Sequence, residues 1–429
     1  MMKRFIILIV AAVAMPLLRA QTTREEVLAD LNRTGGVYYA YPVTDTIVVT
    51  KPPKGYKPFY ISHYGRHGSR YLISDGDYMN VKATIDSAYR GGALSPLGID
   101  LKKRLDNLMT ETYRRGSDLS PLGVRQHRGI AERMVKNYPE VFRGDGEISA
   151  RSTLVPRCIL SMDAFCERLK ELNPKLRTTR ESSNRYMDYL CYHSPESNAY
   201  TSRIWKEQYR KFEEKHTRPE RLIASLFSDP AFVEKNVNPH ELMWGLYWIA
   251  SDAQNTEGGI CFYDLFTPDE LFDLWQCFNY RFYACDGSFP DNGGLTVANA
   301  ANLLRNIIDS ADSAIALGRN SATLRFGHDG NLIPLAALMQ LEGCDLKESD
   351  PSKFYQAFSD WKIAPMAGNI QMTFYRPVKG KGDVLVKLML NERDKRIPVA
   401  TDSYPFYHWD DVKRFYEEII ADAAQKVTL

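Results

Sequence analysis

Five short apolar segments along the chain predict buried strands. They lie at 58–62, 147–150, 323–326, 370–375 and 384–390. Helical spacing of apolar residues precedes the third strand over 295–317, follows it over 331–341 and closes the chain over 410–425. Strands that alternate with helices in this way are typical of an α/β fold, with a sheet flanked by helices.

The stretch from 171 to 300 has a different texture. It is rich in Tyr, Trp, Arg and Glu, its apolar residues have helical spacing, and it contains few β-branched runs. We therefore expect an inserted, mainly α-helical cap domain over 171–300. It would divide the α/β core into a first part at 21–170 and a second part at 301–429, which agrees with a length too great for one average domain.

The sequence Leu-Ser-Pro-Leu-Gly occurs twice, at 94–98 and at 119–123. In each copy the serine is suited to cap a helix and the proline to occupy its first turn. We interpret the similarity as shared helix-start chemistry rather than as an internal repeat.

The first twenty residues have the pattern of a secretory signal peptide. Lys3 and Arg4 precede an apolar run over 5–18, and Ala20 offers a small residue before a cleavage point at Gln21. The run is shorter than the ~20 residues that span a bilayer comfortably, and no later stretch is long and apolar enough to do so. We expect export to the periplasm or the medium, with no membrane association after cleavage. An uncleaved anchor is the alternative.

The charge balance gives no sign of a nucleic-acid partner. The chain has 55 basic and 53 acidic residues, a net charge of +2. Cleavage after residue 20 would remove Lys3, Arg4 and Arg19 and no acid, leaving 52 basic residues against 53 acids, or −1. Nucleic-acid binding usually needs a clearly basic face. Attraction for a small anion must therefore be local.

All seven cysteines lie beyond the predicted signal peptide. In an exported protein some of them are expected to pair, most readily within the group Cys261, Cys277 and Cys285, and the odd count leaves at least one unpaired. No Cys or His spacing indicates a metal site.

Cationic side chains follow three of the predicted strands. They are Arg66, His67 and Arg70 after the first, Arg151 and Arg157 after the second, and His328 after the third. Because ligands of open α/β sheets bind outside the carboxyl ends of the strands, these residues predict one shared cationic pocket. Guanidinium groups match phosphate oxygens in bidentate geometry, so a small phosphate ester is the expected partner.

The motif Arg66-His67-Gly68-Ser69-Arg70 together with His328-Asp329 resembles the histidine acid phosphatases, and among them the branch that contains phytases and multiple inositol-polyphosphate phosphatases. The resemblance extends over most of the chain outside 170–300. Further matches are Arg151-Ser152-Thr153 with Arg157 and Ser161, the segment 119–123 with Gln126, and the segments 365–367, 374–376 and 391–392.

The resemblance implies a histidine-phosphatase-like mixed sheet and a role for each matching residue. His67 would be the nucleophile that accepts the phosphoryl group, and Asp329 would protonate the departing alkoxide and then help to activate water. Four residues would bind the phosphate oxygens: Arg66, Arg70, Arg157 and His328. This chemistry requires no metal or other cofactor.

The motif is mixed at two positions, and this bears on the substrate. Tyr71 after the first motif resembles the inositol-polyphosphate phosphatases, which usually carry His-Ala-Glu at the donor position, whereas His328-Asp329-Gly330 resembles phytases and acid phosphatases. Inositol hexakisphosphate (phytate) is the leading expected substrate. The alternatives are a broad-specificity acid or sugar phosphatase, a mutase of the wider superfamily, and a non-catalytic phosphate-ligand binding protein, against which the intact His67 and Asp329 argue.

Several other residues are interpreted as structural. His63 is expected to be structural, and Arg151 is left out of the core site. Basic residues of the predicted cap are read as a solvated helix face rather than as cleft lining: Arg177, Arg180, Arg203, Lys206 and Arg210. The aromatic residues near 244–263, among them Trp244 and Trp248, are interpreted as the core of the helical domain rather than as a substrate-stacking platform.

Overall fold

The computed structural model of the chain describes residues 22–42, 47, 49–379 and 382–429. The predicted signal peptide at 1–20 lies outside the described residues. Within them, no helix is both long enough and apolar enough to cross a bilayer.

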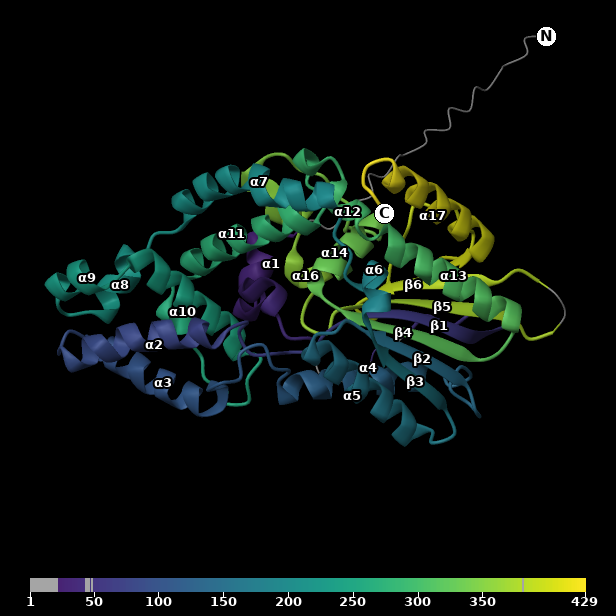
Figure 1. Cartoon of the computed structure of the whole chain (residues 1–429), viewed down its shortest axis with the longest axis horizontal. Helices are drawn as coiled ribbons and strands as arrows, with labels where there is room; N and C mark the ends of the chain where they lie inside the picture. The colour runs from purple at the N-terminus through teal and green to yellow at the C-terminus, as the bar shows by residue number, and fades with distance from the viewer. Residues whose placement is uncertain (1–21, 43–46, 48, 380–381) are drawn as a thin grey trace, which may run out of the picture.

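A mixed eight-stranded sheet forms one end of the molecule (Figure 1). Its order is β3-β2-β4-β1-β5-β6-β7, and β8 pairs with β6. The pairs among β1, β4, β2 and β3 are parallel, and the remaining pairs are antiparallel. The strands are β1 Tyr56–Arg66, β2 Glu147–Ser152, β3 Arg177–Ser182, β4 Ser321–Gly327, β5 Asn369–Pro377, β6 Leu385–Leu390, β7 Arg393–Asp394 and β8 Phe406–His408.

The five predicted strands correspond to β1, β2, β4, β5 and β6, which confirms the expected α/β class. Strand β6 is buried along its whole length, and β1 is buried from Pro58 onward, so both gave clear apolar runs. Strand β3 did not, because its sequence Arg-Thr-Thr-Arg-Glu-Ser lies at the sheet edge and is largely exposed. Since β3 falls inside 171–300, that range is not purely a helical insertion.

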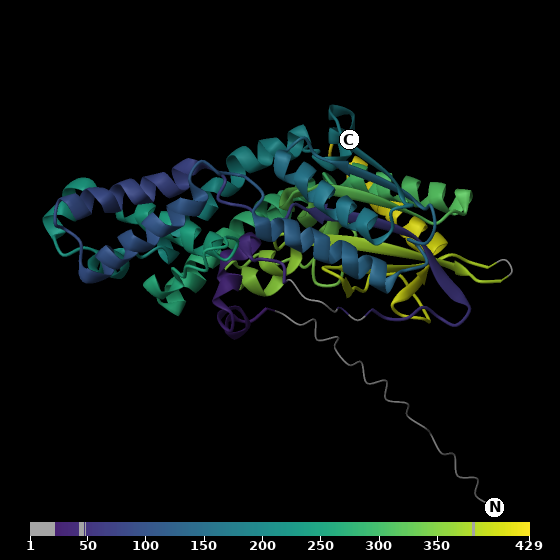
Figure 2. The same ribbon diagram turned by 90° about the horizontal axis from the view of Figure 1, so that it is seen from below.

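Helices cover both faces of the sheet and extend beyond it (Figures 1 and 2). Helices α13 (Ala301–Leu317) and α17 (Trp409–Ala424) lie on one face, and α4 (Pro121–Asn137) and α5 (Pro156–Leu172) lie on the other. The part furthest from the sheet contains α2 Asp75–Arg90, α3 Pro96–Thr112, α8 Glu220–Leu226, α9 Pro230–Asn236 and α10 Pro239–Ala253. Helices α7 (Pro195–His216) and α11 (Pro268–Asp286) join it to the sheet.

The helical part therefore also draws on residues before 171. Helix α2 packs against α10, and α3 packs against α8. The α2–α10 contact is close, because a Cβ added to Gly245 would lie 2.5 Å from a methyl group of Val81. Residues far apart in sequence thus build one helical layer, which the apolar spacing of each helix alone did not reveal.

The helices confirm the predicted starts. Ser95 and Ser120 cap α3 and α4 by accepting the N–H of Gly98 and Gly123, and a proline follows each cap. The segment 295–317 is divided into α12 (Leu295–Ala298) and α13. The other helices are α1 Arg24–Leu28, α6 Met187–Leu190, α14 Asp329–Leu338, α15 Phe354–Ala357 and α16 Asp360–Ile363, with short 3-10 turns at Leu31–Tyr38, Asn184–Tyr186, Tyr263–Leu265, Pro290–Asn292 and Pro351–Lys353.

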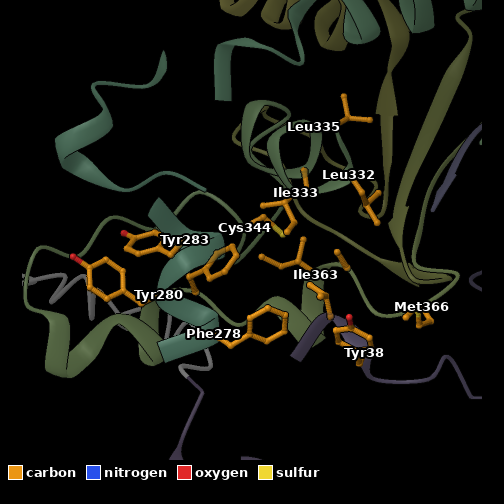
Figure 3. Close-up of a cluster of buried hydrophobic side chains, with 14 of the residues drawn as sticks. Tyr38, Phe278, Tyr280, Tyr283, Leu332, Ile333, Leu335, Cys344, Ile363 and Met366 are labelled. Carbon is orange, nitrogen blue, oxygen red and sulfur yellow. The ribbon is translucent and has the colours of Figure 1, made fainter. Parts of the chain in front are cut away.

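One buried cluster continues from the sheet into the helical part. Figure 3 shows Phe278 of α11 near Ile363 of α16, with Tyr283 of α11 and Ile333 of α14 in the same buried cluster. This packing holds α11 against α14, the helix that begins at Asp329. The geometry around Asp329 is therefore fixed by the hydrophobic core.

All seven cysteines are free. Cys277 and Cys285 lie eight residues apart on α11, about 12 Å along the helix axis. A disulfide requires Cα atoms less than about 7 Å apart, so these two cannot pair. The pairing expected for the group with Cys261 is not formed.

Candidate active site

The residues that follow β1, β2 and β4 meet at one edge of the sheet. Arg66, the last residue of β1, is in register with Gly327, the last residue of β4. His67 donates its backbone N–H to the Gly327 carbonyl at 2.9 Å and accepts the N–H of Ala367 at 2.9 Å. Thr153, directly after β2, donates its N–H to β4 at 3.0 Å. The parallel strands thus bring three sequence-distant segments together at their carboxyl ends.

The imidazole of His67 is buried and oriented. Its Nδ1 lies 2.9 Å from the carbonyl oxygen of Gly68. Because a carbonyl only accepts, Nδ1 carries the proton and Nε2 has a free lone pair. Burial, followed by the charges of Arg66, Arg157 and Arg70, lowers the pKa of His67 well below its usual value. The ring is therefore neutral and suited to nucleophilic attack.

The loop that carries His67 is held against the start of α4. Gly68 donates its N–H to the Ser161 hydroxyl at 3.1 Å, and Ser69 donates its N–H to Gln126 at 2.8 Å. A Cβ on Gly68 would lie 2.6 Å from the Cα of Gly123, so neither backbone leaves room for a side chain there. Gly68 of the first motif and Gly123 of the second Leu-Ser-Pro-Leu-Gly segment are therefore the two sides of one close backbone contact.

Arg66 is fully buried and links the first motif to the second. Its guanidinium donates to the carbonyls of Val37 and Ala364, the latter at 2.7 Å, and its Nη2 lies 2.7 Å from Oδ2 of Asp329. Burial lowers its pKa to about 10, which leaves it charged at any physiological pH. Arg66 therefore supplies a fixed positive charge beside the carboxyl group of Asp329.

Two further guanidinium groups face the same region. Arg70 stacks over the ring of Tyr38 at 4.8 Å and donates to the Tyr71 carbonyl at 2.8 Å. Arg157, in the first turn of α5, donates to Ser117 at 2.6 Å. The Nε atoms of both arginines are buried and have no hydrogen-bond partner among the described residues. Burial and the charge of Arg70 lower the pKa of Arg157, which an anion between them would offset.

His328 and Asp329 begin α14. His328 Nε2 lies 3.1 Å from the Thr153 hydroxyl, and its ring centroid is 5.7 Å from that of His67. Burial, countered by Asp329 and reinforced by Arg157, lowers the pKa of His328 to about 4, so in the free protein this residue is a neutral hydrogen-bonding group and not the cation that the strand-end pattern suggested. Burial would raise the pKa of Asp329, but Arg66 and His328 outweigh it and lower the pKa, so this carboxylate is ionised.

A second carboxyl group lies next to Asp329. Asp286, the last residue of α11, has Oδ1 3.5 Å from the position that a Cβ on Gly330 would take. Burial and the charge of Asp329 raise the pKa of Asp286 to about 7. The start of α14 is therefore flanked by two carboxyl groups, that of Asp329, which is ionised, and that of Asp286, which retains its proton in mild acid.

Some residues considered from the sequence lie outside the site. Arg151 pairs with Glu181 of the neighbouring strand β3 at 3.4 Å and donates to the hydroxyl of Tyr189 of α6 at 3.3 Å. His63 is buried between Phe165 and Phe326, and burial lowers its pKa to about 3. Arg177 and Arg180 of β3, and Arg210 of α7, form ion pairs with exposed acids.

Other residues of the site were missed from the sequence. Asn255 accepts the Ser69 hydroxyl at 2.6 Å and donates to the backbone of Tyr38 at 2.9 Å, which positions the ring under Arg70. Asp252, one turn earlier, accepts the Tyr78 hydroxyl. None of these residues belongs to a motif, and only the folded arrangement of α10 with the first-motif loop identifies them.

Comparison with known proteins identifies the family and the fold. Residues 66–391 match the model of the histidine phosphatase superfamily (branch 2). The fold resembles a multiple inositol polyphosphate phosphatase of Bifidobacterium longum in complex with inositol hexasulfate, with a TM-score of 0.74 and 18% identity over 92% of this chain and 99% of that one. It also resembles the phytase from D. castellii, with a TM-score of 0.64 and 16% identity over 92% and 86% of the two chains.

A comparison of the sequence with curated proteins gives no match. The family model nevertheless covers well over half of the chain, from Arg66, the first residue of the Arg-His-Gly-Ser-Arg motif, to the residue after β6. The expected mixed sheet flanked by helices is also the fold of the similar structures. The chain therefore belongs to branch 2 of the histidine phosphatase superfamily, and it is a phosphoric monoester hydrolase.

Proposed function

We propose that the protein hydrolyses organic phosphate monoesters through a phosphohistidine formed on His67, with Asp329 as the proton donor. The observation that carries the proposal is the arrangement of one neutral imidazole with an open Nε2 among three guanidinium groups, of which those of Arg66 and Arg70 are buried and that of Arg157 is partly buried. A phosphate dianion would accept hydrogen bonds from Arg66, Arg70 and Arg157 and place its phosphorus in front of that nitrogen.

In the first half-reaction, Nε2 of His67 attacks phosphorus as the bond to the ester oxygen breaks. The leaving oxygen takes a proton from Asp329, whose Oδ2 is held 2.7 Å from Arg66. Binding of the dianion engages Arg66 and adds negative charge beside the carboxylate, which raises the pKa of Asp329 and favours its protonated form. Substrate binding thus favours the protonated form of Asp329 that the first half-reaction requires.

In the second half-reaction, water replaces the alcohol. Its oxygen attacks phosphorus, the bond from phosphorus to Nε2 breaks, and the proton of the water passes to Asp329. Inorganic phosphate leaves and His67 regains its free lone pair. The hydrogen bond from Nδ1 to the Gly68 carbonyl keeps the ring in one tautomer throughout.

Two substrate classes fit this chemistry. Inositol polyphosphates, phytate first, are supported by a fold shared with a multiple inositol polyphosphate phosphatase bound to inositol hexasulfate. Phosphomonoesters with a single phosphate, the class of a broader acid phosphatase, are supported by the small number of cations around the site. Export is part of the proposal and rests on the pattern of residues 1–20.

The experiment is phosphate release from p-nitrophenyl phosphate in the presence of a chelator, with acid-quenched samples examined for phosphohistidine by mass spectrometry. His67→Ala should abolish turnover and labelling, whereas His408→Ala, on β8 and away from the site, should retain both. Turnover by His67→Ala, or activity that disappears in the chelator, would refute the mechanism. Tight binding of phosphate without turnover would favour a phosphate-ligand binding protein.

A further inference from the structure

A cavity of about 590 Å³ lies between α2, α7, α10 and α11. Its wall contains two indole rings, Trp244 and Trp248, whose centroids are 5.2 Å apart and whose planes are inclined by 32°. Tyr209 of α7 and Arg281 of α11 also line it. The volume is within the range of cavities that hold small organic ligands.

One residue of the cavity wall, Trp248, lies close to the proposed phosphate-binding residues. The Trp248 ring lies 6.2 Å from Tyr38, and Tyr38 lies 4.8 Å from the guanidinium carbon of Arg70, so Trp248 is within 11 Å of that carbon. Asp252 follows Trp248 by one turn on the same face of α10, and the charge of Arg70 acts on it. Helix α10 therefore runs from the cavity wall to the phosphate site.

Helix α11 makes a second connection, on the side from which the alcohol leaves. Arg281 lines the cavity, and Asp286, just over one turn later on the same helix, borders Gly330 and Asp329. Since Asp329 protonates the leaving oxygen in the proposed reaction, the alcohol departs toward α11. Both connections place the cavity where the organic part of a substrate would lie.

The charges of the cavity do not suit a polyphosphate. Three carboxylates line it, those of Asp77, Glu213 and Glu241, against the single guanidinium of Arg281. Additional phosphates of an inositol polyphosphate would meet more negative than positive charge there. A flat, uncharged ring would instead contact the indoles at no electrostatic cost.

We propose that this cavity is the leaving-group subsite and that it takes an aromatic ring carried by an alcohol with one phosphate, as in a nucleoside monophosphate. The proposal rests on the function proposed above and narrows its substrate class. Trp248 then acts as a specificity-determining residue, since it is half-buried, lines the cavity and lies next to Tyr38. The buried ring of Trp244 packs against it, with the two centroids 5.2 Å apart.

The test compares adenosine 5′-monophosphate with ribose 5-phosphate, because both carry the same phosphate on the same alcohol and differ only in the base. Affinities are measured by calorimetry on His67→Ala, which prevents turnover. We expect the nucleotide to bind about tenfold to a hundredfold more tightly, the range that base stacking on aromatic side chains supplies. In His67→Ala/Trp248→Ala this ratio should fall to near one, and in His67→Ala/Trp248→Phe it should largely return.

A charge variant tests the second part. At low ionic strength Glu241→Lys should tighten the binding of inositol hexakisphosphate several-fold, whereas Glu234→Lys, an exposed position on α9 outside the cavity, should change it little. Equal affinity for the two ribose phosphates in His67→Ala, a ratio that survives Trp248→Ala, or hexakisphosphate bound more tightly than the nucleotide would overturn the inference. If the wild-type protein released phosphate from no ester, the proposed function would be refuted. The affinity comparison would still decide whether the cavity binds an aromatic ring.

Discussion

Asp329→Asn changes one proton and one charge at the centre of the proposed mechanism while preserving the size of the side chain. The amide oxygen still accepts the N–H of Gly330, which now bonds Oδ1 at 2.8 Å. The variant no longer has a proton to give to the leaving oxygen, and it no longer neutralises Arg66 across their 2.7 Å contact. Loss of the proton should slow the chemical step, whereas loss of the negative charge beside Arg66 should strengthen phosphate binding.

The chemical effect depends on the leaving group. Proton donation by a positioned acid contributes about 10²–10⁴ in rate, or roughly 3–5 kcal/mol of barrier. An alkyl ester such as ribose 5-phosphate needs this contribution, because an unprotonated alkoxide leaves poorly. p-Nitrophenolate is a stable anion, so its ester should lose less than about tenfold. Inorganic phosphate should inhibit the variant more strongly, by about fivefold or more, because Arg66 is no longer shared with a carboxylate.

The assay is kcat/KM for both esters, which reports on steps up to departure of the leaving group and excludes hydrolysis of the phosphohistidine. A urea unfolding curve would verify that the variant is folded. Equal losses of kcat/KM for the aryl and alkyl esters would refute the donor role of Asp329. A product-inhibition constant unchanged from the wild type would refute the electrostatic link between Asp329 and Arg66.

Three other changes probe the framework. Glu392→Ala removes the carboxylate that binds the buried guanidinium of Arg133 at 2.6 Å and should lower the free energy of unfolding by about 3–5 kcal/mol in urea titrations. Gly123→Ala puts a Cβ 2.3 Å from the Ser69 carbonyl, and should cost about 1–3 kcal/mol of stability and reduce kcat/KM, because the nucleophile loop must move. Burial raises the pKa of Asp252 to about 7, so the unfolded chain loses this proton at lower pH than the folded one. The wild type should therefore lose stability relative to Asp252→Asn between about pH 4 and pH 7; parallel urea-derived stability curves would contradict this.

The central sheet was predictable because its strands are buried on both faces. A strand such as β6 must be apolar at nearly every position, and this leaves a signal in the sequence. The edge strand β3 is polar, so its place beside β2 depends on backbone pairing that composition does not encode. The partnership of α2 with α10 was also hidden, because amphipathic spacing shows that a helix has a buried face but not which helix covers it.

The site divides in the same way between residues that we propose act on the ligand and residues that hold them in place. Arg66, His67 and Asp329 lie in dense motifs, since their chemistry restricts the residue types at fixed spacing. Tyr38 and Asn255 act through one another on the motif loop, and many residue types would fill such positions in a different packing arrangement. Their roles arise from the junction of the helical part with the sheet edge. The cavity proposed as the leaving-group subsite also lies among these helices, so its lining residues carry no motif and were found only from the folded structure.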